Sequence, residues 1–245
     1  MSIEFKPDTI RHLNHYRERT QKIKYIIIHC SRSTPDMQWE NLDKLKLSAH
    51  YIIGRNGYVI EALPPEKVGY HAGISKWKRS RGQSLNGTSI GIELEAPSMG
   101  QDKKDYTIKQ INKLTKLLQY LMKKYKIQPQ HILAHSDIAP ERKPDPGICF
   151  PWQKLSSLGI TVAADSTAQA ISQKNDVYYL KYIGYNTTNI AAARYAFCRR
   201  WLPQEVKIEK NIQYLLDNPY PKNFRPKNFS RYLKRLAEVL SSYQK

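Results

Sequence analysis

The sequence of 245 residues lacks the signatures of several familiar protein classes. It has three cysteines and no CxxC pair, which argues against a disulfide scaffold and against a cysteine-bound zinc knot. No run of roughly 18 apolar residues occurs, so no transmembrane helix is expected. A phosphate-binding P-loop, a GxGxxG dinucleotide motif and an HExxH zinc-protease motif are also absent. The sequence therefore indicates neither the common nucleotide-binding folds nor a helix-borne zinc protease.

Acidic residues are scarce beside basic ones: 21 Asp and Glu against 40 Lys and Arg, a formal net charge of +19. The excess is +11 over residues 1–160 and +8 over 161–245, so no single basic arm carries it. Such a spread fits any anionic partner, such as a nucleic acid, a membrane surface or an anionic wall polymer. The N-terminus has no apolar signal-peptide segment. This and the unpaired cysteines favour the cytoplasm, with the periplasm or cell envelope as the alternative if a leader was removed.

Hydrophobic patterning predicts a mixed α/β domain over residues 1–160. Alternating and β-branched residues predict strands at 24–30, 88–97 and 131–135, and two strands within 48–63 joined by a turn at Asn56-Gly57. An apolar stripe from Ile108 to Tyr125 predicts a helix, with Thr107 as its N-cap. We expect a central mixed β-sheet flanked by helices.

The composition changes after residue 160. Residues 161–175 are small and polar and are predicted to be a linker. Residues 176–245 are predicted to form a small helical module, with helices at 189–202, capped by Asn189, and at 230–243. We expect few contacts across the linker, so that the first domain would fold without the module. The alternative is a helical extension that packs on the first domain.

The segment HSDIAPERKPDPG, residues 135–147, concentrates ionisable groups on a stiff backbone. Proline pushes the residue before it into an extended conformation, so Lys143 and Asp145 should project to the same side. His135 is predicted to close one strand and His29 another, and the ends of neighbouring strands can converge. Two imidazoles and a carboxylate suit a catalytic Zn²⁺, which keeps a fourth position open for water. We therefore expect His29, His135 and Asp145 to bind a metal.

A hydrolytic metal site also needs a base and a group that holds the oxyanion. A divalent metal lowers the pKa of a bound water from about 16 towards 7, which makes a nucleophile near neutral pH. Glu93 lies on the polar face of its predicted strand and can act as the base, and Lys143 can hold the oxyanion. Glu95 is an alternative base. His50 and His71 are alternative ligands.

Four blocks of the sequence, in order, resemble the type-2 N-acetylmuramoyl-L-alanine amidases, zinc enzymes that cleave peptidoglycan. They are YIIIHCS, SAHYIIGRNGYVIEALPPEKVGYHAG, NGTSIGIELE and AHSDIAPERKPDPG, and they lie within residues 20–152. SIGIELE and the last block are the most specific. The resemblance implies a mixed central sheet flanked by helices. The related peptidoglycan recognition proteins share this fold, and some of them bind without cleaving.

The resemblance also implies a role for each candidate residue. It gives zinc to His29, His135 and Asp145, base catalysis to Glu93 and transition-state stabilisation to Lys143. It makes His50 and His71 cleft-lining or structural, and Cys30 takes a position where some members carry a polar or aromatic cleft residue. Residues 179–203 loosely resemble a three-helix peptidoglycan-binding module.

Together these observations predict a zinc hydrolase of peptidoglycan or of muropeptides, including anhydro-muropeptides. The bond cleaved would join the lactyl group of N-acetylmuramic acid to L-alanine. The alternative is a peptidoglycan-binding protein without activity, which would lack part of the metal set. A nucleic-acid-binding role for the basic surface ranks third, and we expect no dedicated nucleic-acid partner. We expect the chain to be a monomer.

Overall fold

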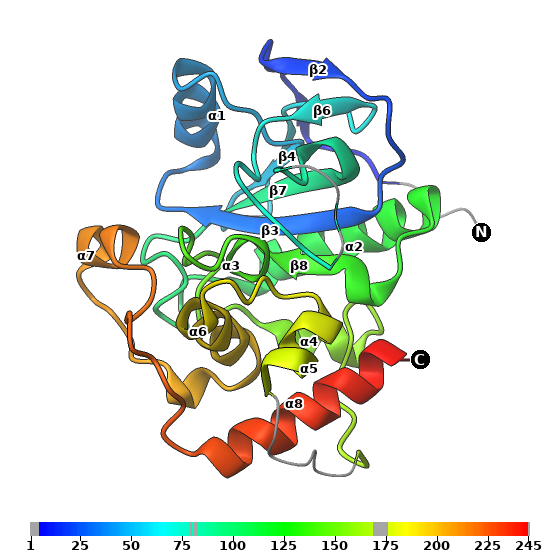
Figure 1. The fold of residues 1–245 in the computed structure, drawn as a ribbon. Helices are drawn as coiled ribbons and strands as arrows, with labels where there is room; N and C mark the ends of the chain where they lie inside the picture. Colours follow the sequence, from blue (N-terminus) through cyan, green and yellow to red (C-terminus); the bar gives the residue numbers. More distant parts are fainter. Residues whose placement is uncertain (1–4, 79, 81–82, 169–175, 245) are drawn as a thin grey trace.

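A six-stranded mixed β-sheet forms the centre of the computed structural model, which describes residues 5–78, 80, 83–168 and 176–244 (Figure 1). Its strands are β1 (Thr9–Ile10), β3 (Tyr25–Ser31), β4 (Tyr51–Ile53), β5 (Val59–Glu61), β7 (Ser89–Glu95) and β8 (Ile132–Ala134). Their spatial order is β1-β5-β4-β7-β3-β8. β3 runs parallel to β7 and β8, and β4 antiparallel to β5. β2 (Tyr16–Glu18) and β6 (Lys67–Gly69) form a separate antiparallel pair.

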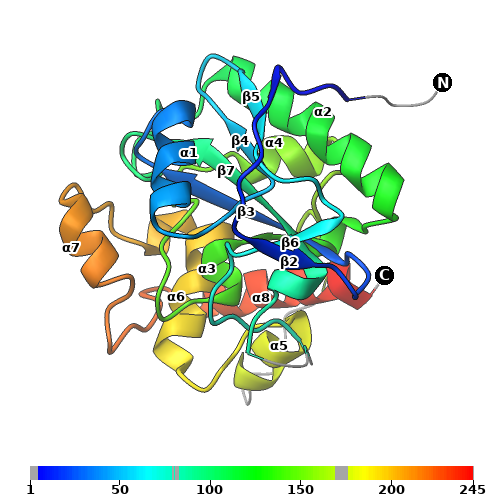
Figure 2. The same cartoon turned by 90° about the horizontal axis from the view of Figure 1, so that it is seen from above.

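Helices cover both faces of this sheet. The α-helices of the described residues are α1 (Pro35–Lys44), α2 (Ile108–Tyr125), α3 (His135–Ile138), α4 (Trp152–Ser157), α5 (Asp176–Ile183), α6 (Ile190–Trp201), α7 (Ile212–Asp217) and α8 (Phe229–Gln244). α2 lies on one side of β3, and α5, α6 and α8 lie on the other (Figures 1 and 2). None of these helices combines the length and the apolar character needed to cross a bilayer. The expected fold class, a mixed sheet flanked by helices, is confirmed.

Successive residues of β3 enter two different apolar clusters, because side chains alternate along a strand. Ile26 and Ile28 join the cluster beneath α2, together with Leu114 and Leu118 of that helix. Ile27 joins the cluster beneath α5, α6 and α8. The predicted alternation along this strand is therefore confirmed. His29, two residues after Ile27, lies on the side of the C-terminal helices.

Two local predictions need correction. Ile108 was expected in the buried stripe of α2 but is 74% exposed, since it is the first residue of the helix, at the edge of its packed face. His135 was expected to close a strand, but β8 ends at Ala134 and His135 begins the single turn α3. Pro140 follows this turn, so proline does not oppose it. Thr107 caps α2 as predicted, accepting a hydrogen bond of 3.1 Å from Gln110 N.

The C-terminal helices pack closely on the sheet. α5, α6 and α8 contribute Leu180, Phe197 and Leu236 to the cluster that also holds Ile27 and Leu133 of the strands. The expectation of few contacts across the predicted linker is therefore wrong, and the packing favours a helical extension. Residues 169–175 of that linker lie outside the described residues. Whether residues 1–160 fold alone stays a prediction.

Candidate metal centre

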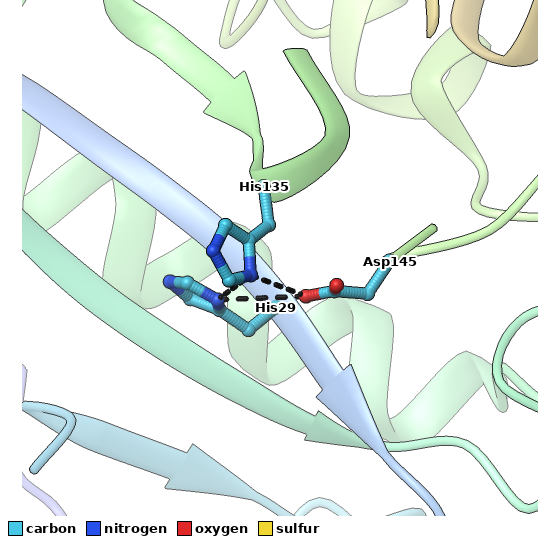
Figure 3. A group of neighbouring side chains, drawn as sticks. All are labelled: His29, His135 and Asp145. Atoms are coloured by element: carbon cyan, nitrogen blue, oxygen red, sulfur yellow. Dashed lines mark hydrogen bonds and ion pairs between the residues drawn. The ribbon is translucent and has the colours of Figure 1, made fainter. Parts of the chain in front are cut away.

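Three buried side chains from three segments meet beside the end of β3. His29 lies near the end of that strand, His135 begins α3, and Asp145 comes from the loop that follows (Figure 3). The two Nδ1 atoms of His29 and His135 are 2.9 Å apart. Asp145 Oδ2 lies 3.0 Å from His135 Nδ1 and 3.5 Å from His29 Nδ1. The structure thus brings together all three expected metal ligands, each 5% exposed or less.

The Nε2 atoms of both histidines, which face away from the centre, have partners of their own. These partners indicate whether the Nδ1 atoms, which face the centre, are free to bind a cation. His135 Nε2 lies 3.3 Å from Ala72 O, a carbonyl that can only accept a hydrogen bond. His29 Nε2 lies 3.0 Å from His71 Nδ1. If both Nε2 atoms carry the proton, two Nδ1 lone pairs and a carboxylate oxygen converge with no proton between them. A cation at their centre satisfies all three acceptors, and outer partners of this kind commonly orient metal-binding histidines.

Burial sets the charge state of these groups. It lowers the pKa of His29 to about 4, and the neighbouring His135 acts in the same direction. Burial alone would raise the pKa of Asp145, but the charges and hydrogen bonds of His135 and His29 hold it well below its usual range. At neutral pH His29 is therefore neutral and Asp145 ionised. These are the forms in which imidazole and carboxylate bind a metal.

Backbone contacts fix the loop that carries Asp145. Ser136 N donates to Asp145 O at 2.9 Å, which ties the loop to the turn that bears His135. Gly147 has a φ of +84°, and a Cβ at this position would lie 2.4 Å from Met99 O. Both the conformation and the close contact require glycine. The DPG sequence therefore serves to place the Asp145 carboxylate.

Glu93 lies next to the centre and differs sharply from its rival Glu95. Glu93 pairs in register with His29 on the neighbouring strand, and its Oε2 is buried without a hydrogen-bond partner among the described residues. Burial, aided by the charge of Asp145, raises the pKa of Glu93 to about 8. Glu95 Oε2 instead accepts a hydrogen bond of 3.0 Å from Arg55 N. Of the two carboxylates, Glu93 is the one free to exchange a proton at the centre.

Lys143 lies beside the centre without a fixed partner. Its side chain is half-buried and forms no hydrogen bond with the described residues. Its positive charge nevertheless acts to lower the pKa of both Glu93 and His29. The ammonium group is therefore near both, as its predicted role requires, and is free to meet an incoming oxyanion.

The three remaining candidates occupy different surroundings. His71 is partly exposed and contacts His29; a Cβ on Gly91 would lie 2.5 Å from the His71 ring, so glycine leaves room for it. His50 is fully buried, and its Nδ1 accepts a hydrogen bond from Gly91 N at 3.0 Å. Cys30 is 5% exposed within the cluster beneath α2. Their burial argues against direct substrate contact by His50 and Cys30, whereas His71 remains a candidate for the rim.

Sequence reasoning missed a set of polar residues that support the centre, which come from α3, from α6 and from the segments that follow α3 and α5. Asp137, two residues after His135, is fully buried and accepts hydrogen bonds from Arg200 at 2.6 Å and Tyr185 at 2.8 Å. Arg142 donates to Ala72 O, the carbonyl that also holds His135. The Arg199-Arg200 pair inside an apolar helix was the available signal, because arginine is rarely buried without a partner.

Comparison with known proteins gives concordant matches. A family model described as N-acetylmuramoyl-L-alanine amidase matches residues 19–148. The N-acetylmuramoyl-L-alanine amidase AmiD of Escherichia coli is 35% identical over 159 residues, 59% of this chain and 56% of that protein. The 1,6-anhydro-N-acetylmuramyl-L-alanine amidase AmpD of Enterobacter cloacae is 40% identical over 121 residues, 49% of this chain and 61% of that protein. The chain thus spans less than two thirds of either relative.

The likeness in fold extends further than the likeness in sequence. A solved structure of E. coli AmiD, in complex with the substrate anhydro-N-acetylmuramic acid-L-Ala-D-gamma-Glu-L-Lys, aligns with a TM-score of 0.66 at 24% identity. The alignment covers 93% of this chain and 91% of that one. At this coverage the shared fold includes most of the C-terminal helical region as well as the sheet.

Proposed function

The chain belongs to the family of N-acetylmuramoyl-L-alanine amidases, and from this premise we propose that it hydrolyses the amide bond between the lactyl group of N-acetylmuramic acid and L-alanine. One observation carries the proposal: three buried acceptors from His29, His135 and Asp145 converge beside Glu93, whose Oε2 has no hydrogen-bond partner in the described part of the chain. The name of AmpD and the substrate bound to AmiD support anhydro-muropeptides as the substrate class.

The donor set fits Zn²⁺, which binds imidazole nitrogen and carboxylate oxygen and keeps an open position in catalytic sites. Held by His29, His135 and Asp145, it would supply the positive charge that polarises a carbonyl and makes water more acidic. Ala72 O and His71 would keep the two imidazoles oriented through their outer nitrogens.

Two side chains of the protein would then take part in the reaction: Glu93 would transfer the protons, and Lys143 would stabilise the developing negative charge. In its ionised form, Glu93 accepts a proton from the attacking water as the oxygen–carbon bond forms at the lactyl carbonyl. The Lys143 ammonium lies near the oxyanion that develops there. When the carbon–nitrogen bond breaks, Glu93 returns the proton to the leaving amine of L-alanine. The products are a muramic acid carboxylate and a peptide with a free N-terminus.

Product analysis tests the proposed reaction. Incubation with a soluble anhydro-muropeptide should release the intact stem peptide, seen by mass spectrometry; a chelator should stop the release and added Zn²⁺ restore it. Elemental analysis should find one zinc per chain, lost in His135→Ala. An unchanged zinc content in His135→Ala would contradict the assignment of the metal site. Binding of muropeptide without any peptide release by the zinc-loaded protein would support the alternative, a binding protein without activity.

The two neighbouring glutamates provide a matched test of the base. Glu93→Gln should retain zinc and the fold but lose about 10²–10⁴ in kcat, because proton transfer by a positioned side chain is worth about that much. Glu95→Gln lies two residues along the same strand and should change kcat little. The reverse pattern, with Glu95→Gln inactive, would contradict the assignment of Glu93.

A further inference from the structure

The side chain of His71 lies between a metal-binding residue and a buried serine. Its Nδ1 lies 3.0 Å from His29 Nε2, and its Nε2 lies 3.3 Å from Ser89 Oγ. Ser89 is the first residue of β7 and is fully buried. The ring of His71 also packs against Gly91, where a Cβ would lie 2.5 Å from it. The two ring nitrogens of His71 therefore face two different partners, one at the centre and one in β7.

The hydroxyl of Ser89 has a single proton to donate, and its surroundings indicate where that proton points. Ser89 Oγ lies 2.8 Å from Leu85 O, a carbonyl that can only accept, and 3.3 Å from His71 Nε2. The shorter contact takes the hydroxyl proton. The lone pairs of Ser89 Oγ are then left for a donor, and His71 Nε2 is the group beside them. His71 thus carries its proton on Nε2 and presents a bare Nδ1 to His29.

The bare Nδ1 of His71 determines where His29 carries its own proton. A ring nitrogen without a proton accepts a hydrogen bond, so His29 donates from Nε2. Because a neutral imidazole carries one proton, Nδ1 of His29 then keeps its lone pair. This Nδ1 is the atom that lies 2.9 Å from His135 Nδ1 at the candidate metal centre. The hydrogen bonds between His29 and Leu85 O therefore all run away from the centre.

The turn before β7 also holds the partner of the second histidine. Asn86 Oδ1 accepts hydrogen bonds from His71 N at 3.2 Å and from Ala72 N at 2.7 Å. Ala72 O in turn lies 3.3 Å from His135 Nε2. Asn86 therefore fixes the backbone of the two residues that contact the metal-binding histidines, and Ser89 sets the direction of the hydrogen bonds that pass through His71.

We propose that Ser89 is a positioning residue of the metal centre: by accepting a hydrogen bond from His71 Nε2, it holds His71 in one tautomer and leaves His29 Nδ1 free for the metal. This inference rests on the metal site of the proposed function. Without the Ser89 hydroxyl, a zinc-loaded centre would leave the His71 Nε2–H without this acceptor. The other tautomer of His71 would instead place the proton of His29 on Nδ1, where the metal binds. Either arrangement weakens metal binding.

The histidine tautomers of the zinc-loaded full chain test the proposal directly. Proton–nitrogen correlation spectra recorded through two bonds distinguish a proton on Nδ1 from one on Nε2, and His71→Gln identifies the signals of His71. We expect the Nε2–H tautomer for both His29 and His71. A proton on His71 Nδ1 would overturn the proposal. The measurement needs no hydrolysis, so failure of the proposed function would be seen separately, in the zinc content and the reaction products.

Two neighbouring hydroxyls provide a matched pair of variants. Ser89→Ala should lower zinc affinity about 10–100-fold, measured by chelator competition, because groups that orient metal ligands are worth about that much. Thr88→Ala is the control: Thr88 Oγ1 donates to the same Leu85 O, at 3.3 Å, and in the described part of the chain no contact joins Thr88 to a histidine. It should bind zinc like the unaltered protein.

The same pair of variants separates a positioning role from a structural one. In the metal-free proteins, Ser89→Ala should increase the Nδ1–H form of His71, whereas Thr88→Ala should not. A loss of stability alone would leave this tautomer unchanged. Equal zinc affinities of the two variants would overturn the proposal, as would an unchanged His71 tautomer in metal-free Ser89→Ala. If Ser89→Ala does not fold, the tautomer of His71 in the unaltered protein decides.

Discussion

The two faces of the central sheet are covered by side chains of different chemical character. The side beneath α2 is almost entirely hydrocarbon, with Ile26, Ile28 and the leucines of that helix in one cluster. The side beneath α5, α6 and α8 combines an apolar cluster with buried charges, chiefly Asp137 and Arg200. A buried ion pair adds little net stability over apolar packing, but losing one partner is costly. The first side chiefly supplies stability, although Tyr106 donates a hydrogen bond to Pro146 O beside Asp145. The second side adds buried charges that contact the metal-binding segment.

The buried charges on the second side reach both ends of the metal-binding segment. Asp137 accepts a hydrogen bond from the backbone N–H of Ala134, the residue before His135. It also forms an ion pair with Arg200. Arg199 donates to the carbonyl of Lys143, two residues before Asp145, at 3.4 Å. Helix α6 thus contacts the segment on either side of its loop. Changes in α6 should therefore affect metal binding, whereas equal losses of packing under α2 should not.

Removal of the C-terminal helices is the largest change that tests this contrast. A chain ending at residue 165 would expose Ile27 and Leu133 and leave Asp137 without Arg200 and Tyr185. We expect insoluble protein, or protein without the circular dichroism of a folded sheet. A soluble, folded fragment that binds zinc and cleaves muropeptides would show that the second side is dispensable, as the domain boundary predicted from sequence requires.

Two single substitutions should distinguish a loss of stability from a displacement of the metal-binding residues. Arg200→Met leaves Asp137 as an unpaired buried charge and should cost about 3–5 kcal/mol. Leu118→Ala opens a cavity under α2 and should cost about 2–5 kcal/mol. Urea unfolding measures both losses.

Zinc affinity then distinguishes these two variants. Measured by chelator competition under conditions where both are folded, it should fall only in Arg200→Met. Equal zinc affinities would mean that the buried ion pair stabilises the fold but does not position the metal ligands.

The caps of α2 and α6 give the smallest expected difference between the two sides. Thr107→Ala removes the hydrogen bond from Gln110 N and the one that Thr107 Oγ1 donates to Arg55 O, and should cost about 1 kcal/mol. Asn189→Ala removes the equivalent bond from Ala192 N and two further bonds, to Tyr220 Oη at 2.7 Å and to Glu141 Oε2 at 3.3 Å, so the loss should be larger. Thermal unfolding can rank the two variants. A greater loss in Thr107→Ala would contradict the view that α6 is held by more polar contacts.

Long, strongly patterned elements could be predicted from the sequence. The β-branched residues of β3 and β7 and the helical periodicity of α2 and α8 determine these elements locally. The short strands β1, β2 and β6 carry no such pattern, since tertiary pairing alone holds two or three residues in a strand. The four-residue turn α3 was missed for the same reason.

Some residues of the candidate centre could likewise be predicted from the sequence, and others could not. His29, His135, Asp145 and Glu93 come from chemically distinctive motifs, so they could be named from sequence, and the structure places all four together. The partners of Asp137 could not be named, because Arg200 lies 63 residues away and its ion pair depends on how α6 packs. Burial of His50 was likewise invisible, because no local pattern distinguishes it from the partly exposed His71.

The pairing of His29 with Glu93 across β3 and β7 restricts how this chain can change during evolution. Side chains in a strand alternate between faces, so inserting one residue inside β7 before Ile92 would turn every later residue over. Glu93 would then enter the hydrocarbon beneath α2, and Ile92 would face the metal centre. Insertions and deletions should therefore accumulate in the connecting loops and stay out of these two strands.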